Sequence, residues 1–494
     1  MIRTIRLLLA TALLAAMSCA AQQLPGETAG GPAGGESVTG VELKGKAPVN
    51  PETLRVVLPK PKEATLSNGL RVALLEDHKL PTFSMQLLVH GGGLADPADR
   101  HGLAMATAAL LSEGTKQRSS REIAEQLASL GAVFNAGASP SSGETSIGIT
   151  GLIENADAIL ALVADVIRNP QFPEGELDKF KSRFLSQLQY QRSLPGFLAQ
   201  EQFMRAVYGG EHPASYIVPP ESVLQALTPA DLAAYHRAWY RPNNSILIAH
   251  GDLTLQELVV KLERAFAGWS SHEIPGRASP ALAPPEKARV LLIDRPGSVQ
   301  TSLWVGGLGI ERDSEDYFAV LVMNHILGGG PASRLFINLR EDKGYTYGVS
   351  SAFTGSTFPG IMVASTDVRT AVTEGALHEL MAEITRIGTE PVSEIELKNA
   401  KRALVGRFAR SLDSPQALIA NVATQKIYGL PDDYWDMYPR HVEAITPADV
   451  QRVARKYYDP QRLQIIAVGD GASVRKVLAK YGEVEGAAPA ANAR

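Results

Sequence analysis

The chain contains 494 residues, of which 45% are hydrophobic and 20% are charged, and its net charge is −4. This composition is typical of a globular protein, and the length is enough for about two to four domains. There is no basic excess, which argues against nucleic-acid binding. No apolar run after the first twenty residues is long enough to cross a bilayer.

Residues 1–19 have the features of a signal peptide. Arginines precede an apolar run over residues 7–17, and Ser18, Cys19, Ala20 and Ala21 follow it. Two kinds of processing fit these small residues. One is ordinary cleavage after Ala20 or Ala21, and the other is lipidation of Cys19, the only cysteine of the chain. Both predict export to the bacterial periplasm, with membrane anchoring in the second case, and a single cysteine excludes an internal disulfide bond.

The composition divides the rest of the chain. Residues 20–55 are rich in small residues and proline, which predicts a flexible tether. A first domain is predicted over 56–270, and a second over 289–482. The segment 271–288 carries four prolines and is typical of a linker. Residues 483–494 are predicted to be a disordered tail.

Apolar patterning predicts strands and helices in the same order in both domains. The expected strands of the first domain are 71–75, 82–90 and 245–249, and their counterparts in the second are 290–293, 300–306 and 463–468. Apolar residues at helical spacing predict one long helix over 176–190 and another that contains 397–408. We therefore expect an α+β fold in which each domain has a mixed, mostly antiparallel sheet backed by helices.

The strongest positive signal is an internal duplication. The run 227–232 recurs 218 residues later at 445–450, and a Tyr-x-Pro and a Gly-Asp pair recur at the same offset. In both runs a threonine precedes proline, as at a capped helix start, at Thr228 and Thr446. The repeat predicts two homologous domains.

The segment 102–115 resembles the zinc-binding helix of the pitrilysin/insulinase-type metallopeptidase family. That family carries an inverted His-x-x-Glu-His signature, whose histidines bind zinc and whose glutamate is the general base. The three positions read Met105, Ala108 and Ala109 here. The family's third ligand is a glutamate on the following long helix, and the resemblance places Gln187 there, 78 residues after Ala109. None of the four can replace the family's ligands and base, so we expect this chain to hold no zinc.

No other catalytic centre stands out. No two of the ten histidines are three or four residues apart, and the Gly-rich run 328–330 lacks the Gly-Lys-Ser/Thr of a nucleotide loop. His101, just before the degenerate helix, is expected to be a surface or capping residue.

The second domain keeps more of the family pattern. The segment 327–347 is similar to the family's Gly-rich loop, helix and strand, which end in an arginine and a tyrosine seven residues apart, here Arg340 and Tyr347. The resemblance implies that this pair binds substrate and stabilises the developing oxyanion. The structural alternative is that Arg340 complements a helix dipole and Tyr347 packs in the core.

A second family feature is an edge strand over 134–139, which resembles the strand on which active members bind peptides by strand addition. The alternative is an ordinary strand and turn.

The resemblance implies a non-catalytic subunit of an exported, heterodimeric zinc peptidase. In that arrangement a homologous partner holds the zinc, and this chain supplies Arg340 and Tyr347 for the hydrolysis of peptides or unfolded proteins. The alternative is a catalytically inert scaffold or peptide-binding protein of the same fold. An independent enzyme with a different centre would need a cluster of residues that the sequence does not contain.

Overall fold

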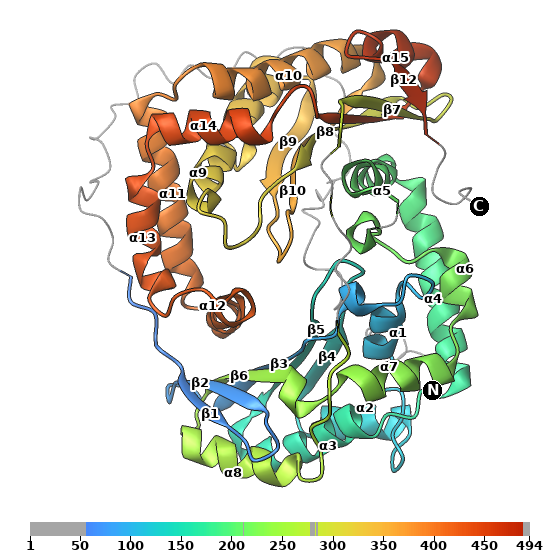
Figure 1. Ribbon diagram of the computed structural model, residues 1–494, viewed down its shortest axis with the longest axis vertical. Helices are drawn as coiled ribbons and strands as arrows, with labels where there is room; N and C mark the ends of the chain where they lie inside the picture. The colour runs from blue at the N-terminus through green and yellow to red at the C-terminus, as the bar shows by residue number, and fades with distance from the viewer. Residues whose placement is uncertain (1–55, 211, 277–281, 283–284, 488–494) are drawn as a thin grey trace, which may run out of the picture. The chain divides into compact units, whose positions relative to one another are not determined.

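Two six-stranded sheets organise the chain (Figure 1). The computed structural model describes residues 56–210, 212–276, 282 and 285–487, and all of these belong to one compact unit, 53–494. The predicted signal peptide with Cys19 and all of the predicted tether therefore lie outside the described residues, as do parts of the linker and tail. No helix among the described residues has the length and apolar character needed to span a bilayer.

The first sheet has the order β1-β2-β6-β3-β5-β4. Its strands are β1 (Lys62–Thr65), β2 (Arg71–Glu76), β3 (Thr82–Val89), β4 (Val133–Gly137), β5 (Thr145–Leu152) and β6 (Ser245–Gly251). Only the β2/β6 pair is parallel, and the other pairs are antiparallel. The three predicted strands of this domain are β2, β3 and β6, and the predicted edge strand is β4.

The second sheet repeats this plan in the order β12-β7-β11-β8-β10-β9. Its strands are β7 (Arg289–Asp294), β8 (Gln300–Leu308), β9 (Thr346–Phe353), β10 (Ile361–Arg369), β11 (Gln464–Gly469) and β12 (Val484–Gly486). The β7/β11 pair is parallel like β2/β6. At the outer position β12 runs parallel to β7, whereas β1 runs antiparallel to β2. The predicted pair of mixed, mostly antiparallel sheets is confirmed.

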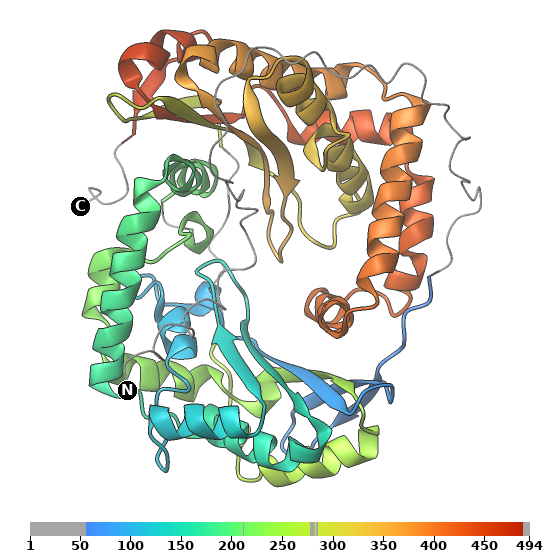
Figure 2. The same ribbon diagram turned by 180° about the vertical axis from the view of Figure 1, so that it is seen from behind.

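Helices of the same domain cover one face of each sheet. The helices of the first domain are α1 (Leu103–Ala109), α2 (Ser120–Ser129), α3 (Ala156–Arg168), α4 (Glu174–Ser193), α5 (Pro195–Tyr208), α6 (Glu221–Ala226), α7 (Pro229–Trp239) and α8 (Leu255–Ala265). Those of the second are α9 (Tyr317–Gly328), α10 (Thr373–Thr389), α11 (Glu394–Ser411), α12 (Pro415–Tyr428), α13 (Tyr434–Ala444), α14 (Pro447–Tyr457) and α15 (Gly471–Leu478). Helices α3, α7 and α8 share a core with the first sheet, and α9, α10 and α14 share one with the second (Figures 1 and 2).

Each domain places one helix against the sheet of the other domain, an arrangement that we call the helix exchange. Alternate strand residues point to opposite faces of a sheet, and on the second sheet Leu291 and Ile466 pack against Leu198 and Phe203 of α5, a helix of the first domain. On the first sheet, Ile248 belongs to a core that includes residues of α12, a helix of the second domain. The exchange is pinned at both ends by polar contacts: the Tyr208 hydroxyl donates to the Pro359 carbonyl at 3.2 Å, and Lys426 pairs with Glu63 at 2.6 Å.

Candidate functional site

The degenerate zinc segment is a short helix in an apolar setting. Helix α1 ends at Ala109, so the expected helical segment 102–115 continues as turns beyond that residue. Ala108 is buried, Ala109 is half-buried, and the half-buried Met105 packs against the first-domain core. These side chains carry no lone pair suited to a divalent cation except the weak thioether of Met105. They do not fit the zinc that the family resemblance implies, and we route no chemistry through a metal in this chain.

The position assigned to the third ligand lies on the solvent side of α4. Gln187 is exposed, whereas Phe184 and Leu185 are half-buried and pack against the same core as α1. The assignment of Gln187 rests on sequence spacing alone. Within the described ranges, no group of three or more His, Cys, Asp or Glu side chains is placed to hold a metal ion.

A carboxylate that the sequence analysis missed caps this helix. The two Asp96 oxygens accept hydrogen bonds from the backbone N–H groups of Gly102 at 2.7 Å and Ala104 at 2.8 Å. Burial raises the pKa of Asp96 to about 7, although these backbone bonds act in the opposite direction. His101 is also buried, and its ring packs on that of Tyr216 with centroids 4.5 Å apart. The expectation that His101 is a surface or capping residue was wrong.

The second-domain pair lies on a π-helix and the strand that follows it. Arg340 belongs to the π-helical segment η5 (Phe336–Asp342), and Tyr347 lies near the start of β9, the edge strand of the second sheet. The guanidinium carbon of Arg340 is 4.6 Å from the ring centroid of Phe336 and 5.0 Å from that of Tyr347. These distances are within the range of cation–π attraction. The structure thus brings Arg340 and Tyr347 together.

A tight turn produces this contact. Gly344 ends the π-helix in the left-handed region, with a φ of 60°, and the Tyr345 N–H donates to the Leu339 carbonyl at 2.9 Å. The chain therefore reverses between Arg340 and Tyr347. A side chain at Gly344 would meet no neighbour, so its positive φ is what favours glycine there.

Tyr347 is exposed and does not pack in the core. This residue is 85% exposed, so the alternative in which it packs in the core is wrong. Arg340 is half-buried and makes a 3.6 Å ion pair with the neighbouring Glu341. An exposed aromatic ring beside a cation, with both groups reaching solvent, can bind a polar or anionic ligand group.

The predicted edge strand β4 has a free side in the described part of the chain. It pairs only with β5, and Val133 is one of its exposed residues. Neither β4 nor β9 contains a proline or a charged residue, the usual features by which edge strands avoid pairing with other chains.

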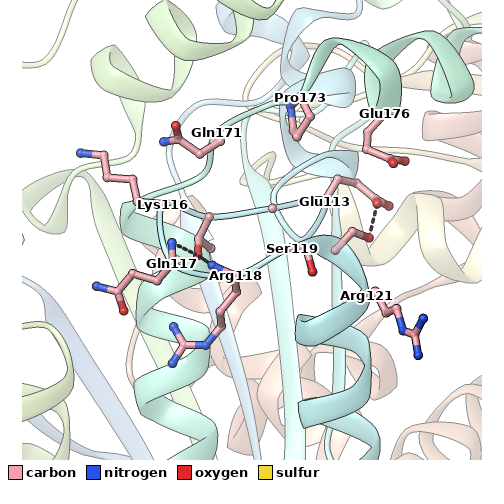
Figure 3. A pocket seen from close by; sticks show the side chains of 12 residues that line it. Glu113, Lys116, Gln117, Arg118, Ser119, Arg121, Gln171, Pro173 and Glu176 are labelled. Carbon is pink, nitrogen blue, oxygen red and sulfur yellow. Dashed lines mark hydrogen bonds between the residues drawn. The ribbon is translucent and has the colours of Figure 1, made fainter.

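A separate surface pocket lies at the starts of α2 and α4 (Figure 3). It has a volume of about 570 Å³ and opens to solvent. Its rim carries charges of both signs, including Glu113, Lys116 and Glu176, and Glu113 accepts a 2.6 Å hydrogen bond from Ser120. It is lined by the last residues of the segment 102–115 but by none of the candidate site residues, and its mixed charges define no ligand.

Fold and site together define a peptidase-type, two-domain protein that carries Met105, Ala108 and Ala109 at the expected metal position. Residues 71–221 match the sequence model described as Insulinase (Peptidase family M16), and residues 226–404 match the one described as Peptidase M16 inactive domain. The two matches cover more than half of the chain. The chain therefore belongs to the M16 peptidase family.

Individual relatives agree with this membership. The chain is 25% identical to the uncharacterized zinc protease YmxG of Bacillus subtilis over 72% of this chain and 85% of that protein. A solved peptidase M16 inactive domain from Pseudomonas fluorescens is 28% identical, with a TM-score of 0.75 and coverage of 83% of this chain and 98% of that one. The periplasmic protease PqqL of Escherichia coli shares the fold, with a TM-score of 0.71 at 16% identity, over 92% of this chain and 49% of that one.

Proposed function

We propose that this chain is the zinc-less subunit of an exported, two-subunit zinc peptidase. It supplies Arg340 and Tyr347 to the active site of a homologous, zinc-bearing partner, and the complex hydrolyses peptides or unfolded proteins. The observation that carries the proposal is the contact between the Arg340 guanidinium and the exposed ring of Tyr347.

The chemistry of the pair supports this role. Peptide hydrolysis develops negative charge on the carbonyl oxygen, and fixed donors aimed at that charge lower the barrier by about 3–4 kcal/mol each. Arginine and the tyrosine hydroxyl both donate hydrogen bonds. A Tyr347 ring that is 85% exposed makes little contribution to the core, and its hydroxyl can reach a ligand from solvent.

The residues of α1 support the proposal that the partner, and not this chain, holds the zinc. The Met105, Ala108 and Ala109 side chains cannot hold zinc together, so hydrolysis by a metal mechanism requires a second chain. The similarity to a solved M16 inactive domain from Pseudomonas fluorescens favours the same assignment.

The first experiment tests whether the proposed zinc-bearing partner exists. We expect the tagged full chain, purified from its own cells, to retain a homologue that carries His-x-x-Glu-His, as identified by mass spectrometry. Elemental analysis should assign zinc to the complex and no stoichiometric zinc to this chain alone. Peptide hydrolysis should need both subunits.

The arginine is then tested in the reconstituted complex. Arg340→Ala should lower turnover while the complex still assembles. Arg289→Ala is a matched control, because both side chains are 37% exposed and each pairs with a glutamate. A complex that hydrolyses peptides equally well with Arg340→Ala would contradict the proposed role.

The proposed location depends on the N-terminal segment. We propose that lipidation of Cys19 anchors the exported chain to a membrane. Cys19→Ser should shift the mature protein from the membrane fraction to the soluble fraction, as measured by fractionation and immunoblotting. A wild-type N-terminus that begins at Ala21 or Gln22 without an acyl group would instead indicate ordinary cleavage.

A scaffold or peptide-binding role is the second candidate, favoured by the free edge of β4. It predicts peptide binding by the isolated chain, no hydrolysis with any partner, and no kinetic effect of Arg340→Ala.

A further inference from the structure

The turn that carries Arg340 is π-helical rather than α-helical over Phe336–Asp342. The Lys343 N–H donates to the Asn338 carbonyl at 3.0 Å, which is the i to i−5 bond of a π-helix. π-Helical turns are rare and frequently occur at functional sites. A wider turn rotates the residues that follow it relative to an α-helix, so this bond affects where Arg340 points.

The Asn338 side chain attaches the same turn to α10. Its amide nitrogen donates to Glu379 at 3.0 Å and to Glu383 at 2.8 Å. Lys343, the residue at the other end of the π-type bond, pairs with Glu379 at 3.3 Å. We call Asn338, Lys343 and Glu379 the clasp, because Glu379 contacts both ends of one turn.

The clasp is anchored in the interior. Glu383 is buried and forms a bidentate pair with Arg386, with the closest oxygen at 2.7 Å. The Asn338 side-chain oxygen is buried and has no hydrogen-bond partner among the described residues. A buried acceptor left unsatisfied is costly, so the contacts made by the amide nitrogen are the ones that keep this asparagine in place.

The clasp contacts Arg340 through the backbone, because the Lys343 N–H also donates to the Arg340 carbonyl. Asn338 lies two residues before Arg340, whose guanidinium stacks on Phe336 and Tyr347. We propose that Asn338 is a positioning residue: by holding the π-helical turn against α10 through Glu379 and Glu383, it sets the direction in which Arg340 meets Tyr347. Its importance for turnover rests on the proposed function, whereas its effect on the turn does not.

The effect on the turn is measured in the isolated full chain. Asn338→Ala should speed amide hydrogen exchange in peptides that cover 336–345. It should also increase severalfold the rate at which phenylglyoxal modifies Arg340, as followed by mass spectrometry. Asn169→Ala is the matched control, because Asn169 is also half-buried and donates to a carboxylate, Asp165, at 2.9 Å. This control should change neither quantity in 336–345.

Two further variants keep the test decisive if Asn338→Ala folds poorly. Lys343→Met removes the exposed end of the clasp and should loosen the same peptides. Asn338→Asp places a carboxylate beside two others and should loosen them too, whereas adding Glu379→Gln restores a donor–acceptor pair and should recover much of the protection. Wild-type exchange and modification rates in all of these variants would overturn the proposal.

Turnover separates this proposal from the function on which it rests. In the reconstituted complex, Asn338→Ala should lower kcat with little change in KM, and the Glu379→Gln rescue of Asn338→Asp should restore kcat. A purely structural asparagine would lower the melting temperature without this split. If the turn loosens but Arg340→Ala and Asn338→Ala both leave kcat unchanged, the clasp is correct and the proposed catalytic role is wrong.

Discussion

Tyr347 combines an exposed ring with a hydroxyl that can donate a hydrogen bond. Its ring is 85% exposed and stacks only on a guanidinium among its recorded ring contacts. Its removal should therefore have different effects on stability and on turnover.

Tyr347→Phe tests that difference. The free energy of unfolding should change by less than about 0.5 kcal/mol, as is usual for surface substitutions. In the complex with the proposed partner, turnover should fall on the order of 10²-fold, as for other single oxyanion donors. Tyr190→Phe, at a 62% exposed tyrosine on α4, is the control. Equal turnover of the two variants would make the pair structural.

Asp96 gives a prediction on pH. The pKa of this carboxyl is about 7 in the folded chain and near 4 in an unfolded chain. Between those values the folded state holds the extra proton, so the contribution of Asp96 to stability falls as pH rises from about 4 to about 7. Denaturant titrations should show that Asp96→Asn removes this slope. Asp99→Asn, at an exposed aspartate of the same loop, should keep it. Parallel slopes in both variants would contradict the prediction.

Single residues were predictable where their chemical type decides the answer. That Met105, Ala108 and Ala109 lack the ligands of the family's zinc motif follows from their side-chain chemistry and needs no fold, and the absence of zinc from the chain stays a prediction. The burial of His101 depends on its stacking with Tyr216, which is distant in sequence. The contacts of Asn338 depend on α10, and no local pattern indicates them.

The elements show repetition most clearly at the starts of α7 and α14. Thr228 and Thr446 each accept a bond from the backbone N–H of an aspartate three residues later, and the carboxylate of that aspartate accepts a bond from the threonine backbone N–H. Both are complete capping boxes, as the duplicated sequence suggested.

Removing either cap should lower the free energy of unfolding by a similar amount. Thr228→Ala and Thr446→Ala should each lower the free energy of unfolding by about 1 kcal/mol. Thr424→Ala is the comparison, because its hydroxyl donates to the Ala420 carbonyl within α12 and caps nothing. Chemical denaturation measures all three, and a loss at Thr424 as large as at the caps would argue against this account.

Helices and strands were predictable where their apolar residues follow a clear pattern along the sequence. The apolar face expected in 397–408 is buried residue for residue in α11, and β2, β3, β6, β7, β8 and β11 lie where apolar runs predicted strands. The π-helix was not foreseen, because its wider turn comes from backbone bonding, as in the bond from the Lys343 N–H to the Asn338 carbonyl, rather than from a side-chain pattern.

At the scale of the whole molecule, the sequence predicted the domain repeat but not the packing of α5 and α12 on the sheets of the opposite domains. Both helices contain apolar residues in the sequence, and nothing in their pattern says which sheet those residues will contact. Only the fold shows Phe203 of α5 against Trp304 of β8, with ring centroids 5.8 Å apart.

The exchange predicts the behaviour of a cut chain. A specific protease site inserted in the predicted linker 271–288 should yield two fragments that co-elute in native size-exclusion chromatography, because each fragment provides a helix that covers the other's sheet. Separation should need denaturant. Fragments that part under native conditions would show that the exchanged helices contribute little.

The same exchange has a consequence for biosynthesis. While the chain emerges from the ribosome, all strands of the first sheet are synthesised before α12, so the apolar side chains of Ile246 and Ile248 lack their cover. The N-terminal half therefore waits in an incompletely buried state until most of the chain has arrived. During that interval it is a natural client for holding chaperones, and a truncated product that ends before α12 would expose the same surface to degradation.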